Sequence, residues 1–146
     1  MKTNEKGLAV DNGASGPEKA GMFSAVIQVA IGGAIGAAAR FLLGVWLVRI
    51  TGAGGFPVAV MAANVAGSFL MGVFVVVAAQ KGLTHWGPFV MTGVLGGFTT
   101  FSAFSLEAYT LFERGEAAAA AAYVGLSVGL SIAGLVVGVM VARGLV

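Results

Sequence analysis

The sequence predicts an all-α membrane protein with four transmembrane helices in each subunit. Of its 146 residues, 58% are hydrophobic and only 10% are charged, and the mean hydropathy is +0.97. Soluble domains carry about 25% charged residues, so one water-soluble core does not account for this composition. A hydrocarbon layer is crossed by about 20 apolar helical residues, and four runs reach that length. We expect the helices at about 25–48, 58–79, 89–112 and 117–142.

The first 21 residues differ from the rest of the chain. They are polar and mixed in charge, so we expect a flexible tail followed by a transmembrane domain over 22–146. Pro57 and Pro88 stand just before the second and third runs, where a helix start tolerates proline. Four spans would place both ends of the chain on one side of the membrane.

Charges near the membrane ends specify the orientation weakly. One side would carry Lys19, Lys81 and Arg143, and the other Arg49 and Arg114. The positive-inside rule counts such residues, and three against two is a small bias. This balance is expected of a protein that inserts either way up, although an orientation fixed by the tail stays equally open.

Several function classes are excluded by composition. Eight Lys and Arg residues form no basic run or stripe, so we expect no nucleic-acid partner. Without cysteine, and with His85 as the single histidine, neither a thiolate nor a histidine-based metal site is available. No Ser/His/Asp set and no acid pair stands near the middle of a span, so we expect no enzyme and no organic cofactor.

Small residues recur four apart in all four runs. In membrane proteins this spacing lets helix backbones approach closely, and its recurrence indicates a tightly packed bundle. The pairs are Gly32/Gly36, Ala63/Gly67, Gly93/Gly97, Gly125/Gly129 and Gly134/Gly138.

The third run contains an unusual stretch at 93–107, G-V-L-G-G-F-T-T-F-S-A-F-S-L-E. Gly96 and Gly97 each weaken a helix by roughly 1 kcal/mol relative to alanine, and two threonines follow. Irregular backbone at membrane depth is tolerated only inside protein or beside a water-filled cavity. We therefore expect the third helix to be broken near the membrane middle, with unwound carbonyls suited to a hard cation such as Na⁺.

Side chains after the predicted break suit a small anion. Phe101 and Phe104 are three residues apart and share a helix face, and a phenyl ring has a positive edge. Asn64 and Ser68, one turn apart in the second run, add N–H and O–H donors. The alternative, in which the rings pack and Asn64 makes an interhelical hydrogen bond, stays open.

Polar residues in the other runs extend the same pattern. Tyr123, Ser127 and Ser131 are four apart and form a hydroxyl stripe on one helix face, either as a second wall of the pathway or bonded to their own helix backbone. Arg40 either lies in an electropositive vestibule or extends toward the interface. Glu107 is placed at the pore mouth or in a structural hydrogen bond.

From about residue 25 to residue 142, the chain resembles the fluoride-channel family (Fluc, also called CrcB). Three strings in order carry the resemblance: G-G-x-x-G-x-x-x-R over 32–40, N-x-x-G-S-F over 64–69, and G-G-F-T-T-F-S-A-F-S-L-E over 96–107. It implies a passive F⁻ exporter that confers fluoride resistance, in a bacterial or archaeal-type plasma (inner) membrane. It also implies an antiparallel, dual-topology homodimer with two pores.

The resemblance also implies roles for single residues. The third-span pair would line the pores, the polar side chains would contact the ion, and a structural Na⁺ at the dimer centre would be bound by backbone carbonyls. Ala103 departs from the hydroxyl residue that many relatives carry. The implied residues are Phe101, Phe104, Asn64, Ser102, Tyr123, Ser127 and Ser131 for the anion, Gly96 and Thr99 for Na⁺, and Arg40 and Glu107 at the matching arginine and acid positions.

Two other functions are weighed against this one. A proton-coupled small multidrug or guanidinium exporter also has four spans, but needs a membrane-embedded carboxylate, typically in the first span, where this chain has Gln28 and Arg40. A non-transporting membrane assembly subunit would use the glycine faces for packing alone. It predicts that Phe101, Phe104 and Asn64 can be replaced without loss of ion flux.

Overall fold

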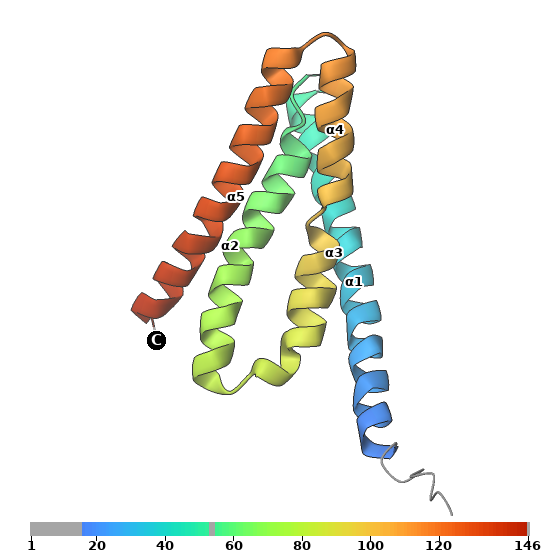
Figure 1. The fold of residues 1–146 in the computed structure, drawn as a ribbon, viewed down its shortest axis with the longest axis vertical. Coiled ribbons are helices and arrows are strands. Elements are labelled where there is room, and N and C mark those ends of the chain that lie inside the picture. Colours follow the sequence, from blue (N-terminus) through green and yellow to red (C-terminus); the bar gives the residue numbers. More distant parts are fainter. Residues whose placement is uncertain (1–15, 53–54, 146) are drawn as a thin grey trace, which may run out of the picture.

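The computed structural model describes residues 16–52 and 55–145, which form four helical spans. The first, second and fourth are single helices: α1 (Gly16–Thr51), α2 (Val58–Lys81) and α5 (Ala117–Leu145). The third is composite: η1 (Thr84–Trp86), the π-helix η2 (Pro88–Leu95), α3 (Gly96–Phe98) and α4 (Phe101–Glu113). All four are long and apolar enough to cross a membrane (Figure 1), which confirms the four-span, all-α prediction.

The first helix begins earlier than predicted. It starts at Gly16, so the last part of the expected flexible tail is helical, and residue 22 is not a structural boundary. Adding residues to an existing helix needs no new nucleation, and Glu18, Lys19 and Ala20 are good helix formers. The rest of the predicted tail, residues 1–15, lies outside the described residues.

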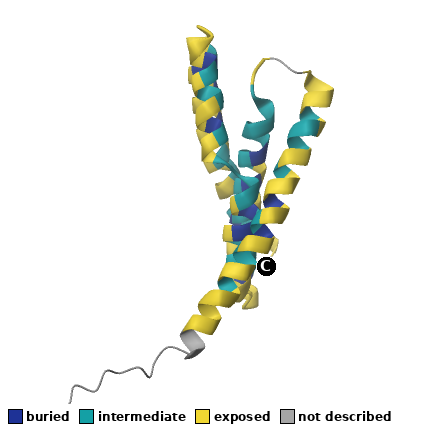
Figure 2. Cartoon of the chain, turned by 90° about the vertical axis from the view of Figure 1, so that its right-hand side faces the viewer, coloured by how far each residue is buried: buried dark blue, intermediate teal, exposed yellow. Residues whose placement is uncertain are grey.

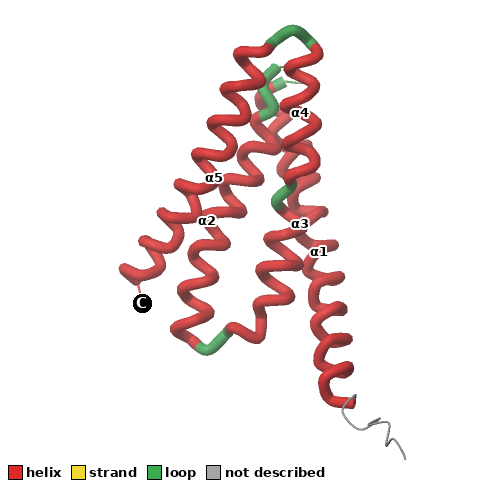
Figure 3. Tube along the Cα trace, viewed as in Figure 1, coloured by secondary structure: helices red, strands yellow, loops and turns green. Residues whose placement is uncertain are grey.

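The third span changes its packing partner halfway along. Its first half, η2 and α3, lies against α1, whereas its second half, α4, packs against α5. Helices α2 and α5 pack along each other, so α2 stands centrally in the bundle (Figure 1). The change of partner falls at the short loop between α3 and α4, drawn in green in Figure 3.

Glycines let α1 and the third span cross at close range. A Cβ atom at Gly36 would overlap the carbonyl group of Val94 and lie 2.8 Å from the nitrogen of Phe98. One at Gly93 would lie 2.9 Å from the Cα of Gly32. The close-packing prediction is therefore confirmed for the pairs in these two spans.

Glycines also allow close contact between α2 and α5, but one predicted glycine pair in α5 does not pack against another helix. A Cβ at Gly138 would overlap the carbonyl oxygen of Phe69, and one at Gly134 would lie 3.2 Å from that of Val65. Gly125 and Gly129 face open space instead. That pair is not a close-packing face within the chain, because both glycines lie on the exposed side of α5, whereas Tyr123 and Ser127 in the same turns are buried.

The break in the third span occurs at two threonines. Thr99 (φ −85°, ψ 160°) and Thr100 (φ −155°, ψ 128°) are extended, whereas Gly96 keeps helical angles. A broken third helix is thus confirmed, but the glycines are not the residues that unwind. Gly97 is instead needed for packing, since a Cβ there would lie 2.6 Å from the carbonyl oxygen of Gly33.

Asn64 holds the open backbone at the break. Its Oδ1 accepts a hydrogen bond from the Thr100 N–H at 2.8 Å, and its Nδ2 donates to the Thr100 carbonyl at 3.0 Å. The Thr100 hydroxyl then accepts from the Ala103 N–H at 3.2 Å, the arrangement of a helix N-cap. One side chain from α2 therefore replaces both backbone bonds that Thr100 loses.

Arg40 satisfies another group freed by the break. The last carbonyls of a helix have no intrahelical donor, and the Arg40 Nε donates to that of Gly97 at 3.2 Å. A cation is also favoured at a helix C-terminus by the helix dipole. Arg40 therefore connects α1 to the break.

Burial is concentrated where α2, α4 and α5 meet. Tyr123 is fully buried, in a cluster with Phe104, Leu111 and Ala120. The outward faces of all four spans are exposed, as the yellow parts of Figure 2 show. They carry large apolar side chains, as expected of a surface covered by lipid or by another membrane protein. The start of α1 and the C-terminus lie at the same end of the molecule in Figure 1.

We predict that Gly36→Ala destabilises the protein by about 1–3 kcal/mol, because the added methyl group meets rigid backbone and must push α1 away from the third span. The midpoint of thermal denaturation in detergent measures this. Gly44→Ala, in the same helix but facing open space, is the matched control and should be neutral or slightly stabilising. Equal midpoints for the two variants would contradict the proposed crossing.

We also predict that Asn64→Leu lowers stability by about 1–3 kcal/mol for each Thr100 group left unpaired. Asn64→Asp keeps an acceptor for the Thr100 N–H but loses the donor to its carbonyl, so we expect an intermediate loss. The same thermal measurement applies, with Ser68→Ala on the next turn of α2 as the control. If Asn64→Leu is as stable as this control, Asn64 does not hold the break.

Candidate functional site

A groove of about 530 Å³ lies beside the break, bounded by α2, the third span and α5. It brings together most of the residues that the sequence singled out, although they come from three separate spans. The predicted residues in its walls are Asn64, Ser68, Gly96, Thr99, Phe101, Phe104, Ser127 and Ser131. Their convergence makes this groove the candidate functional site.

Hydroxyl groups from α5 form one side of the site. Ser127 is 3% exposed, and Ser131, one turn further along, is half-buried. Within the described residues, the hydroxyl oxygens of Tyr123 and Ser127 are buried without a hydrogen-bond partner. Buried polar groups normally have a partner in the protein or in bound water. Ser127 lines the groove, where its hydroxyl can bind a ligand or water, whereas Tyr123 is fully buried and does not line the groove.

Two phenylalanines at the start of α4 flank the groove in different ways. The rings of Phe101 and Phe104 lie 5.3 Å apart at an angle of 51°. Phe104 is buried, but Phe101 is 78% exposed, although both rings line the groove together with polar residues. The Phe101 ring is therefore left uncovered beside the groove, and its role in lining an anion pathway stays a prediction.

The polar residues near Asn64 differ in whether they line the groove. The Asn64 amide already binds Thr100, so the interhelical hydrogen bond considered from the sequence is present, while contact with an anion stays a prediction. Ser68 lines the groove one turn later. Ser102 is exposed and does not line it, with its Oγ 3.2 Å from the Thr100 hydroxyl.

Two backbone carbonyls at the break are available as ligands. Gly96 and Thr99 both line the groove, and no hydrogen bond to their carbonyl oxygens is found in the part of the chain that the structure describes. Carbonyl oxygens without a donor suit a hard cation. These are the same two carbonyls that the family resemblance implies for Na⁺.

The two charged residues predicted near the pore lie outside this groove. Arg40 lines a separate groove of about 660 Å³ between α1 and α2, together with Arg49. Glu107 lines a cavity of about 480 Å³ near the end of α1, together with Arg114. Their roles at a mouth or vestibule stay predictions, and the observed contact of Arg40 is with the break.

Two contributors were not singled out from the sequence. The sequence places Thr100 within the break but assigns it no capping role, although a threonine just before a helix is a preferred N-cap and could have been recognised. Phe56, in the connection before α2, packs its ring against Tyr123. No local sequence signal identifies such a contact, because it joins residues far apart in the chain.

Comparison with known proteins agrees with this picture. The family model described as CrcB-like protein, Camphor Resistance (CrcB), matches residues 27–139. The fluoride-specific ion channel FluC of Ruegeria sp. (strain TM1040) is 66% identical over 123 residues, covering 84% of this chain and 98% of that protein.

Other relatives carry the same name. FluC of Roseobacter denitrificans (strain ATCC 33942 / OCh 114) is 68% identical over 120 residues, 82% of this chain and 95% of its own length. FluC of Paracoccus denitrificans (strain Pd 1222) is 49% identical over 119 residues, 82% and 94% of the two chains. The family match and the near-complete coverage of these relatives establish that the chain belongs to the CrcB family.

Proposed function

We propose that this protein is a fluoride-selective ion channel through which F⁻ leaves the cell passively. The observation that carries the proposal is the high identity, over nearly their whole length, to proteins named fluoride-specific ion channels. The groove at the helix break is the site that we propose for this function. The protein is a channel and not an enzyme.

Export of this kind needs no coupling to protons or ATP. One elementary charge crossing a potential of 100 mV gains or loses about 2.3 kcal/mol. A cell whose interior is negative therefore drives F⁻ outward, and a channel selective for F⁻ protects the cell from fluoride. The proposed location of the multi-pass protein is therefore the plasma (inner) membrane, across which this potential acts.

The proposed anion pathway follows the groove. Hydroxyl donors of Ser127 and Ser131 stand on one side, and the rings of Phe101 and Phe104 stand on the other. Ring edges carry partial positive charge, so together with O–H donors they can replace part of the ion's hydration shell. The N-terminus of α4 opens at the same place, and its dipole favours an anion.

The proposed active form is an antiparallel homodimer with two pores. Phe101 is 78% exposed beside a groove that one chain leaves open, and a second copy would cover both. The balance of Lys19, Lys81 and Arg143 against Arg49 and Arg114 is compatible with insertion in both orientations.

The proposed dimer centre is a Na⁺ ion bound by the Gly96 and Thr99 carbonyls of both subunits. Two carbonyls from each chain would give four oxygens, a reasonable start for a hard cation that prefers oxygen ligands. The choice of these carbonyls is supported because both residues line the groove and neither carbonyl accepts a hydrogen bond from the described residues. No side-chain ligand is required.

We predict that liposomes containing the pure protein release F⁻ when valinomycin and K⁺ supply the counter-charge, and that Phe101→Ile slows release about tenfold or more by removing the ring edge. A fluoride electrode measures the rate. Phe112→Ile, which alters another exposed ring of α4 outside the groove, is the matched control and should conduct normally.

The same assay separates the competing functions. A non-transporting subunit gives no efflux, and a proton-coupled exporter gives efflux that follows a pH gradient. Chloride release as fast as fluoride release would overturn the proposed selectivity. Normal rates in Phe101→Ile would show that the ring does not line the pathway.

We predict that Gly96→Ala weakens the dimer while leaving the single chain intact. Within one chain the added Cβ would meet only the Met91 carbonyl oxygen, at an ordinary 3.4 Å, but it would intrude between two copies that meet at the break. Thermal midpoints of the dimer in Na⁺ and in K⁺ measure this, because an ion bound only when folded adds stability, about 2.7 kcal/mol at 100 times its Kd.

Gly129→Ala is the control, since it also faces open space but lies away from the break. The wild type and this control should be more stable in Na⁺, and Gly96→Ala should lose that difference. If the wild type has the same midpoint of thermal denaturation in Na⁺ and in K⁺, and the Gly96→Ala dimer is as stable as the wild type, the proposal of a central Na⁺ is wrong.

A further inference from the structure

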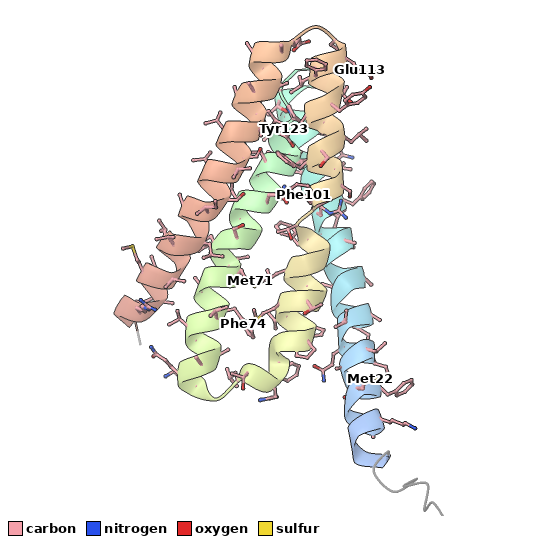
Figure 4. All side chains as sticks on the ribbon, in the orientation of Figure 1. Met22, Met71, Phe74, Phe101, Glu113 and Tyr123 are labelled. Atoms are coloured by element: carbon pink, nitrogen blue, oxygen red, sulfur yellow. The ribbon has the colours of Figure 1, made fainter. Side chains whose placement is uncertain are left out.

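Phe56 begins a row of four aromatic rings that ends at the helix break. Its ring centre lies 5.5 Å from that of Tyr123, edge to face at 81°. Tyr123 lies 5.4 Å from Phe104 at 34°, and Phe104 lies 5.3 Å from Phe101. We call Phe56, Tyr123, Phe104 and Phe101 the aromatic row. Figure 4 labels Tyr123 and Phe101, which lie in the same half of the molecule as α4.

The backbone around Phe56 is held in a defined turn. Pro57 has φ −79° and ψ 67°, and the Val58 N–H donates to the Phe56 carbonyl at 2.8 Å. These are the features of an inverse γ-turn, and proline fixes its central φ angle. Gly55 precedes it at φ +139°, where a side chain would be strained. The turn therefore sets the direction in which the Phe56 side chain leaves the backbone.

Phe56 also separates two environments. It lines the cavity of about 480 Å³ that contains Glu107 and Arg114, and it contacts Tyr123, which is fully buried. The Tyr123 hydroxyl finds no hydrogen-bond partner within the described residues. Without the Phe56 ring, Tyr123 would have space and a polar cavity to turn toward, and Phe104 would lose the surface against which it packs.

We propose that Phe56 is a positioning residue for the anion pathway: it holds Tyr123 in place, and Tyr123 in turn fixes the Phe104 ring in the groove wall. Phe56 does not line the groove itself. The inference rests on the proposed function, because the consequence of a displaced Phe104 is a change in F⁻ passage. It adds a residue from the α1–α2 connection to a pathway otherwise built from spans.

The test is F⁻ efflux from liposomes containing the full-length protein, normalised to folded protein recovered by gel filtration. Phe56→Leu keeps an apolar side chain but removes the ring, and we expect efflux to fall about 3- to 10-fold, the range of one aromatic contact. Phe56→Tyr keeps the ring and should restore efflux to near the wild-type rate. Phe112→Leu, an exposed ring on α4 outside the aromatic row, should match the wild type.

A double variant distinguishes positioning from general destabilisation. If Phe56 acts through Phe104, Phe56→Leu should change efflux less than about twofold in a Phe104→Ile background, because interacting residues are not additive. The same fold-reduction in both backgrounds, a normal rate in Phe56→Leu, or an equal loss in Phe112→Leu would overturn the inference. A wild type that releases no F⁻ would overturn the proposed function itself, so the two failures are distinguishable.

Discussion

The two hydrogen bonds between Asn64 and Thr100 are the interaction on which the rest of this structure depends. In hydrocarbon, an unpaired backbone N–H or C=O costs several kcal/mol, so a helix interrupted at membrane depth needs replacement partners. A carboxamide carries a donor and an acceptor side by side, as a peptide group does. A single asparagine on α2 can therefore satisfy both groups of Thr100, and α4 is free to start in a new direction.

At the break, the C-terminus of the first half of the third span meets the N-terminus of the second half. Helix ends of opposite partial charge therefore lie next to each other. The first half ends in carbonyls, of which Gly97 binds Arg40 while Gly96 and Thr99 stay available. The second half begins with N–H groups beside Phe101. Because the two helix dipoles meet head to tail at the break, a cation is favoured on one side and an anion on the other. This division of roles follows from the backbone before any side chain is considered.

The sequence could predict most of what depends on composition and local pattern. Length and hydropathy predicted the four spans, and the Gly–Gly–Phe–Thr–Thr run placed the break within a few residues. It could not tell which of those residues unwind, because Gly96 and Gly97 have low helix propensity but Gly97 is held helical by its contact with α1. The contacts of Arg40 with Gly97 and of Phe56 with Tyr123 join residues 57 and 67 positions apart, which no short-range pattern contains.

The glycines of the third span lie on two different faces: one packs against α1, and the other is exposed. Gly93 and Gly97 are four apart, face α1, and have no room for a Cβ, whereas Gly96 has room for one and is exposed. Packing within the chain therefore explains the first two but gives no reason for a third glycine at that position. A reason exists if a second backbone approaches Gly96 as closely as α1 approaches the other two. Gly96 lines the same groove as the exposed Phe101 ring and the free carbonyl of Thr99. These three features together are the support for the proposed contact with another copy of the chain.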